Sequence, residues 1–261
     1  MTKKEESLAV IHRHLEEAKT RVIDRVAYNF AEDAVVFNNL IDTPLIGKEM
    51  IREFCKVVML PDPYPDFDQH LQVLAMTAED EFASIIYHVD PVIPLGVDTF
   101  LIQNDRIAFE TATQLRRKGV YEKEIDTAGI IAVEDPKSIL NRETESFVRK
   151  HMDNLCRFAM EENAEDYTDD IIFLTNKAKE ASRGKEAVSA VYADMKKEME
   201  SIPLCKADFI IKVYGNIILC YAQSPTQEAY IIVTCVLEDG KIKYESVSVR
   251  KGLIRQNRTG D

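Results

Sequence analysis

Two histidines occupy positions where an imidazole could carry out proton chemistry. His14 lies between Ile11 and Leu15, on the apolar face of a helical pattern, and His151 has the equivalent place in a second helical pattern. An imidazole titrates near neutral pH, so it can give or take a proton under working conditions. Burial lowers the pKa of such a group, whereas a nearby carboxylate raises it. A histidine on an apolar face can equally be a core residue bonded to a local partner, and both interpretations stay open.

Other motifs of enzyme chemistry do not occur in the sequence. The five histidines are scattered, without the H-x-x-x-H or H-E-x-x-H spacing of a metal site. There is no phosphate-binding loop, dinucleotide fingerprint or nucleophile elbow. The sequence therefore predicts no metal site and implies no bound cofactor, so any chemistry would come from the side chains alone.

The elements that would position the histidines are repeated along the chain. Gly-Lys-Glu starts at Gly47 and again at Gly184, each time ahead of a helical pattern. The same shift of 137 residues places His14 on His151, and a shift of 135 places IQNDRIAFET on LEDGKIKYES, as a small loop deletion would leave. Repeats of roughly 110 residues are too long for a solenoid, so we interpret the chain as a tandem duplication of one domain.

The Gly-Lys-Glu triplets themselves are interpreted as structural signals. Glycine permits the turn before the helix, and a glutamate in the first turn suits the helix dipole. We therefore assign them no part in an active site.

We predict a first domain over residues 1–115, a connector over 116–140 and a second, degenerate domain over 141–261. Each domain opens with an amphipathic helix, about 7–30 and 144–163, and continues with a short strand, a second helix and four strands. Helices followed by a run of antiparallel strands are typical of an α+β fold. Such a sheet must curl its apolar face around the helix, which leaves a cone whose mouth is a natural ligand pocket.

The composition limits the possible partners. The chain of 261 residues is 46% hydrophobic and 30% charged, with a net charge of −12, which argues against nucleic acid or an anionic membrane as the main partner. No apolar run approaches the ~20 residues of a membrane span, and the N-terminus shows no signal-peptide core. Five cysteines without a C-x-x-C motif indicate reduced thiols and a cytoplasmic protein.

Three parts of the first unit match a known family: the segment VIHRHLEEAKTRVIDRVAYNFAEDAVVFNN, the Gly-Lys-Glu helix and the closing DTFLIQNDRIAFE. They resemble the nuclear transport factor 2-like superfamily, over about 8–114 and, in the second unit, over about 146–250. SnoaL-like polyketide cyclases and ketosteroid isomerases are the most similar members. The resemblance implies two tandem cone-shaped α+β barrels, each a curved antiparallel sheet wrapped around a long N-terminal helix. This fold hosts isomerases, hydratases, cyclases and non-enzymatic binders.

The resemblance also implies site residues in the first unit. In ketosteroid isomerases a helix-one tyrosine and a protonated aspartate on a late strand donate hydrogen bonds to the developing oxyanion, and these positions are His14 and Asp98 here. The general-base aspartate of that family corresponds to Asn38. Because asparagine cannot abstract a proton from carbon, the isomerase mechanism does not carry over unchanged.

In the second unit the three positions hold His151, Thr175 and Val233. This unit therefore looks stripped of acid–base chemistry apart from its histidine, and we expect it to serve as a scaffold. Members of the family often dimerise through their sheets, so the resemblance implies an intrachain pseudo-dimer and leaves a further homodimer open.

Two functional classes follow. The first is a cofactor-free isomerase, dehydratase or cyclase, in which Asp98 would fix the tautomer of His14 and Asn38 would orient a carbonyl or a water. The second is a non-catalytic ligand-binding or assembly protein with the same fold. In both cases we expect a small apolar ligand in the cone, with His151 and Thr175 facing the second cone. Three aromatic residues are candidates for the pocket wall, although core is their ordinary role: Phe37, Phe54 and Phe100.

Overall fold

The computed structural model describes residues 1–59, 67–90, 93–115, 138–157, 159–200, 209–223 and 229–251. The chain divides into two compact units, Met1–Pro136 and Lys137–Asp261. The predicted connector, 116–140, lies almost entirely outside the described residues, so its boundaries stay predictions.

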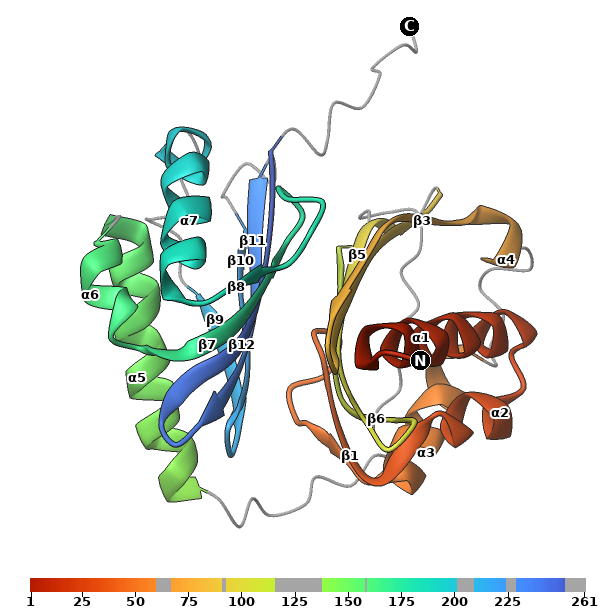
Figure 1. The fold of residues 1–261 in the computed structure, drawn as a ribbon. Coiled ribbons are helices and arrows are strands. Elements are labelled where there is room, and N and C mark those ends of the chain that lie inside the picture. Colours follow the sequence, from red (N-terminus) through yellow and green to blue (C-terminus); the bar gives the residue numbers. More distant parts are fainter. Residues whose placement is uncertain are drawn as a thin grey trace, which may run out of the picture. The chain divides into compact units, whose positions relative to one another are not determined.

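The first unit contains four helices and six strands in its described residues (Figure 1). They are α1 (Lys3–Thr20), α2 (Ile23–Tyr28), β1 (Phe30–Asn38), β2 (Leu45–Ile46), α3 (Lys48–Met59), α4 (Phe67–His70), β3 (Leu71–Glu79), β4 (Phe82–Val89), β5 (Ile93–Gln103) and β6 (Arg106–Leu115).

The second unit repeats this order, without a described counterpart of α4. Its elements are α5 (Ser138–Arg157), α6 (Met160–Ala164), β7 (Tyr167–Thr175), β8 (Ser182–Arg183), α7 (Lys185–Glu200), β9 (Ile210–Tyr214), β10 (Ile217–Gln223), β11 (Ala229–Glu238) and β12 (Lys241–Lys251).

The single opening helix predicted over 7–30 is wrong in one respect, because the structure has two helices there. The first helix begins earlier than predicted, at a capping box formed by Thr2 and Glu5. It ends where Arg21 adopts a left-handed backbone conformation with a φ of 55°. Arg21 donates its amide hydrogen to the Ala18 carbonyl there, which satisfies part of the helix end.

The two sheets have the same topology, β2-β1-β6-β5-β4-β3 and β8-β7-β12-β11-β10-β9. The expectation of a purely antiparallel sheet needs one correction, since β1 pairs with β6 in parallel and β7 pairs with β12 in parallel. Each sheet is therefore mixed. Identical order and pairing in both units confirm the α+β fold as a tandem pair.

The Gly-Lys-Glu triplets have the structural role predicted for them. Gly47 and Gly184 have φ values of 85° and 86°, a region that glycine enters without steric cost. Their amides donate hydrogen bonds to β1 and β7, at 2.8 Å and 2.9 Å respectively. The following lysines, Lys48 and Lys185, each form an ion pair with a carboxylate of the same strand and open α3 and α7.

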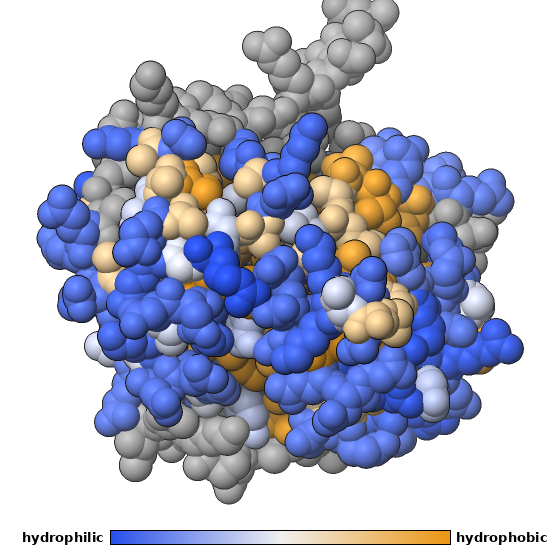
Figure 2. All heavy atoms as spheres, viewed as in Figure 1, coloured by the Kyte–Doolittle hydropathy of each residue, from blue (hydrophilic) through white to orange (hydrophobic). Residues whose placement is uncertain are grey.

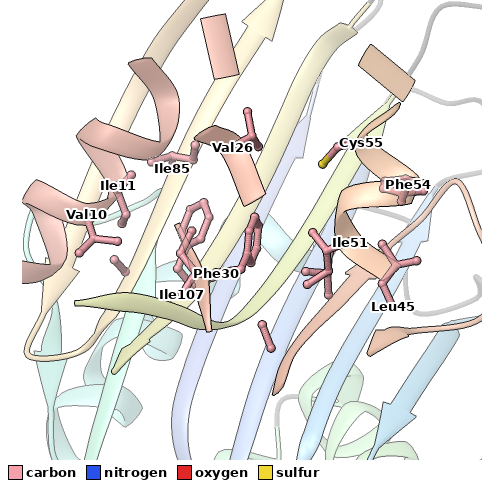
Figure 3. Packing of buried hydrophobic residues seen from close by; sticks show 14 of the residues in the cluster. Val10, Ile11, Val26, Phe30, Leu45, Ile51, Phe54, Cys55, Ile85 and Ile107 are labelled. Atoms are coloured by element: carbon pink, nitrogen blue, oxygen red, sulfur yellow. The ribbon is translucent and has the colours of Figure 1, made fainter. Parts of the chain in front are cut away.

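Each unit has its own hydrophobic core between its helices and one face of its sheet (Figure 1). In the first unit the sheet curves around α1, and Val10 and Ile11 of that helix pack with Phe30 and Ile107 (Figure 3). We call the helix-covered face of each sheet its concave face. The surface in Figure 2 is largely hydrophilic. Among the helices of the described residues, none is long and apolar enough to cross a membrane.

Candidate functional site

Strand register places the polar candidates of the first unit on its concave face. Residues directly opposite each other on paired strands share a face, and residues two apart on one strand do too. Asp98 pairs with Ala112, which also pairs with Asn38, and Glu110 pairs with Phe100 of the core cluster. Asp98, Asn38 and Glu110 therefore all point toward the helices.

A hydrogen-bonded chain fixes Asp98 at this face. The Gln114 side-chain amide donates to the Tyr87 hydroxyl at 3.2 Å, and that hydroxyl donates to the Asp98 carboxyl at 3.5 Å. Tyr87 of β4 lies directly opposite Gly96 of β5. A Cβ atom on Gly96 would approach three atoms of the Tyr87 ring to 2.2–2.6 Å. Glycine at this position is therefore what lets the phenol ring lie over β5 and reach Asp98.

Two carboxyl groups share this part of the concave face. Asp98 and Glu110 are diagonal neighbours on adjacent strands, and each is at most 9% exposed. Burial, together with the neighbouring Glu110, raises the pKa of Asp98 well above its usual range. Burial raises the pKa of Glu110 to about 8. Two buried like charges cannot both ionise cheaply, so the pair retains a proton near neutral pH.

His14 lies on the same side of the sheet but is chemically isolated. Its ring stands edge-on to Phe30 at a centroid distance of 5.4 Å and near Phe100 at 6.0 Å. Its Nδ1 atom is buried without a hydrogen-bond partner. Burial, and to a lesser extent Arg13, lowers the pKa of His14 to about 4, so the imidazole is neutral at pH 7.

The other predicted positions have local roles. Asn38 Oδ1 accepts a hydrogen bond from the Leu40 amide, and Thr175 Oγ1 accepts one from the Lys177 amide. Both side chains thus cap the backbone two residues further on, at the end of their strand.

The three aromatic candidates do not share one location. Phe54 and Phe100 belong to the concave core cluster. Phe37 alternates with Val36 and lies on the opposite face of β1, so it does not line the concave face as we had expected.

The second unit holds a buried network that the three compared positions did not predict. His151 Nδ1 lies 2.9 Å from Asp166 Oδ2, and its Nε2 lies 3.5 Å from Glu245 Oε1. The Tyr167 hydroxyl donates to Glu245 Oε2 at 2.7 Å, and the Tyr192 hydroxyl donates to Oε1 at 3.1 Å. His151 and Glu245 are fully buried. The expectation that this unit has no acid–base chemistry apart from its histidine therefore missed the buried carboxyl groups of Asp166 and Glu245.

The network shifts the pKa of His151 in the opposite direction to that of His14. Burial by itself lowers the pKa of His151, but the hydrogen bonds to Asp166 and Glu245 outweigh it and the pKa rises to about 9. The imidazolium then donates from both ring nitrogens. Because Asp166, Glu245 and both tyrosines satisfy one another, the network is a structural centre of the second unit.

Sequence reasoning missed the two glutamates, although a signal was present. The shift of 135 that aligns β6 with β12 places Glu110 on Glu245, inside the segments used to find the repeat. An acidic residue is thus retained at the same position of both strands, and this is the signal that could have found the glutamates. The tyrosines and Asp166 had no such internal match.

Comparisons with known proteins are limited to structure. No family model matches the chain, and no curated protein matches it. A SnoaL-like protein of unknown function from Burkholderia thailandensis is 16% identical, covers 43% of this chain and 97% of its own, and has a TM-score of 0.38. An NTF-2 like protein of unknown function from Burkholderia xenovorans is 12% identical, covers 51% and 98%, and has a TM-score of 0.36.

A chain from Kribbella flavida, described provisionally as a ketosteroid isomerase, is 16% identical, covers 52% of this chain and 96% of its own, and has a TM-score of 0.35. Each of these proteins is comparable in length to one unit of the present chain. Two six-stranded mixed sheets, each covered by helices on one face, make this chain similar in fold to NTF2-like and SnoaL-like proteins.

Proposed function

We propose that the first unit binds a small, mainly apolar molecule at its concave face and moves a proton on it without a cofactor, as an isomerase, dehydratase or cyclase does. The observation that carries this proposal is the carboxyl pair of Asp98 and Glu110 on adjacent strands. One proton is held by two groups whose pKa values are raised by burial. Such a pair contains a general acid and a general base at the same pH.

The carboxyl pair replaces the His14–Asp98 dyad as the proposed proton carrier. Among the described residues, Asp98 has Tyr87 as its side-chain partner, and no hydrogen bond joins it to His14. In the proposed step the ionised carboxyl takes a proton from the ligand while the protonated carboxyl returns one, so the pair keeps its total proton count. His14 stays neutral and offers a hydrogen bond to the ligand, and Tyr87 positions Asp98.

Hydrogen–deuterium exchange on candidate ligands tests the reaction class. We would incubate the full chain in D₂O with a panel of small cyclic ketones and follow exchange at the α-carbon by NMR. We expect wild type to catalyse exchange, and Glu110→Gln and Asp98→Asn to lose about 10²-fold or more. Tyr192→Phe in the second unit is the control and should keep the wild-type rate. Absence of exchange across the panel, or undiminished exchange in both carboxyl variants, would remove the proposal.

A non-catalytic binding or assembly role is the second candidate. It is favoured by Asn38, whose carboxamide caps the Leu40 amide where the resembling isomerases have a base. It is also favoured by the internally satisfied network of the second unit. Ligand retained in native mass spectrometry, without any exchange in D₂O, would support this alternative.

Pairing of the two units through their sheets is a further part of this proposal. The faces turned away from the helices carry apolar side chains such as Val97 and Ile232, which suit a sheet-to-sheet contact. Val97→Asp should then increase amide exchange in both units, and exchange confined to the altered unit would contradict the pairing. Light scattering of the full chain distinguishes a monomer from a homodimer.

We also retain the proposal of a reducing, cytoplasmic setting. Among the described residues it is supported by the free cysteines Cys55, Cys220 and Cys235.

A further inference from the structure

The two units place a buried glutamate at the same position and surround it differently. Glu110 of β6 corresponds to Glu245 of β12, and each pairs with a core residue of the neighbouring strands. In the second unit two tyrosine hydroxyls donate to Glu245, one to each carboxyl oxygen. Within the described parts of the first unit, no hydrogen bond reaches the Glu110 carboxyl.

The missing donors can be traced residue by residue. Tyr192 is the eighth residue after Gly184, and Cys55 is the eighth residue after Gly47, so the two occupy the same turn of equivalent helices. Cys55 is buried and its sulfur points from α3 into the core cluster (Figure 3). Its thiol lies close enough to Glu110 for that carboxyl to contribute, after burial, to a pKa raised to about 12.

The ring pair beside the Tyr192 position has the same geometry in both units. The His14 and Phe30 rings meet at 5.4 Å and 89°, and the His151 and Tyr167 rings meet at 5.4 Å and 88°. What differs is the ring on α7, because its counterpart α3 carries no ring at that position. Tyr192 packs against Phe173 at 5.2 Å, whereas the first unit has Cys55 and Val36 at these two positions.

The second unit thus shows which group is absent from the first: a phenol that donates a hydrogen bond to the buried glutamate. The aromatic ring of Tyr192 is held between α7 and β7, and its hydroxyl donates to Glu245 of β12. A buried acid without a donor costs free energy, and a ligand that supplies the donor recovers it.

We propose that the first unit binds a planar ring that carries a hydroxyl group, a phenol or a cyclic enol, with the ring beside Cys55 and the hydroxyl donating to Glu110. This inference rests on the proposed function only in using the same concave face, and it names the ligand class. The phenol of Tyr192 shows the geometry that the ligand would reproduce.

Matched ligands test the hydroxyl directly. We would titrate the full chain with 4-ethylphenol and with its methyl ether, 4-ethylanisole, and follow binding by NMR. The two probes have nearly the same ring, and only the phenol can donate. At pH 9, above the Glu110 pKa of about 8, we expect the phenol to bind about tenfold tighter or better, in line with one hydrogen bond to a charged group. Equal affinities, or no binding of either probe, would overturn the inference.

Two substitutions locate the site. Glu110→Gln should reduce the preference for the phenol over the ether to about one, because an amide is a weaker acceptor than a carboxylate. Cys55→Tyr should abolish phenol binding by placing the second unit's own side chain in the site. It should also melt at a higher temperature than Cys55→Phe, which supplies the ring without the hydroxyl. Tyr192→Phe is the control and should leave the preference unchanged.

The outcomes separate this inference from the proposed function. Phenol binding that depends on Glu110, without exchange of any ketone in D₂O, would keep the ligand class and remove the proton transfer. Glu110-dependent exchange without a preference for the phenol would do the reverse. If Cys55→Tyr does not fold, the ligand pair and Glu110→Gln decide the question alone.

Discussion

The same five positions of the two units carry different chemistry. In the first unit they hold His14, Asn29, Phe30, Cys55 and Glu110, and in the second His151, Asp166, Tyr167, Tyr192 and Glu245. The histidine and the glutamate are common to both. Asn29 accepts a hydrogen bond from Arg13, whereas Asp166 holds His151. Three of the five positions differ, and the histidine pKa is about 9 in the second unit, where Asp166 and Glu245 raise it, and about 4 in the first, where burial lowers it.

The same fold uses its buried polar groups for stability in the second unit and leaves them available to a ligand in the first. In the second unit the ionisable groups at these five positions form hydrogen bonds with one another. They are therefore not available to bind a ligand. The first unit leaves its histidine and glutamate unpaired and adds Asp98 and Tyr87, where the second unit has Val233 and Ala222. A buried polar group without a partner is costly to stability and is typical of a site that binds something.

The largest contrast should come from removing the glutamates. Glu245→Leu leaves a buried imidazolium and two phenols without their acceptor, and we expect the second unit to lose about 3–5 kcal/mol of unfolding free energy. Glu110→Leu leaves no donor unsatisfied and should change the first unit by less than about 1 kcal/mol. Amide exchange under denaturant, followed by mass spectrometry, reports each unit separately. Similar losses in both units would refute the assignment of a structural network.

Gly96→Ala should break the part of the site that only the first unit has. The new methyl group would overlap the Tyr87 ring, and overpacking of this kind costs about 1–3 kcal/mol. The second unit has Ile231 and Ala222 at these two positions, so its strand pair already tolerates a side chain there. Adding Tyr87→Ala to Gly96→Ala should therefore recover part of the loss. Simple addition of the two single effects would show that the ring does not set the requirement for glycine.

The units should respond to pH in opposite directions through their histidines. The folded pKa of His151 is raised, so its contribution to stability is complete below about 6.5 and is lost as the pH rises through about 9. The folded pKa of His14 is lowered, so stability is lost as the pH falls from about 6.5 toward 4. One titrating proton changes the unfolding free energy by at most about 1.4 kcal/mol per pH unit.

Glu110 adds to the response of the first unit, because a carboxyl with a raised folded pKa loses stability as the pH rises from about 4.5 to about 8. Amide exchange of each unit between about pH 4 and 10 measures how the stability of that unit depends on pH. His14→Gln and His151→Gln should each remove the histidine-dependent change of stability with pH in its own unit only. A variant that leaves this change in place would exclude its histidine as the source.

The smallest effect expected is from exchanging the neighbours of the histidines. Asp166→Asn should lower the pKa of His151, and Asn29→Asp should raise the pKa of His14, with stability changes of about 1 kcal/mol. The chain has only five histidines, so single His→Gln variants assign the imidazole NMR signals that report both pKa values. Unmoved signals would show that burial alone determines the difference.

The fold was predictable to the extent that its signals are local. Apolar periodicity and the Gly-Lys-Glu triplets located the helices and strands, since they depend on neighbouring residues. The break at Arg21 carries no glycine signal, because a non-glycine residue enters the left-handed region there. The parallel pairing of β1 with β6 joins segments about 70 residues apart, which no local pattern specifies.

The candidate site was predictable only in part, for a different physical reason. His14 was found from the apolar face of a helical pattern, whereas Asp98 came only from the family resemblance. Phe37 was misassigned because a difference of one residue on a strand reverses the face. The role of Glu110 follows from its neighbours in space, which no local pattern specifies. The contrast between Cys55 and Tyr192 is visible only once both helices are placed against their strands.

The parallel pairing of first and last strands has a consequence for biosynthesis. In each unit the first strand, β1 or β7, lies between a two-residue strand and the last described strand, β6 or β12, so the sheet cannot be completed until β6 or β12 has been translated. Such distant contacts slow folding, and domains of a nascent chain generally fold one at a time from the N-terminus. The first unit has its closing strand by Leu115 and can finish folding while the second is still being translated.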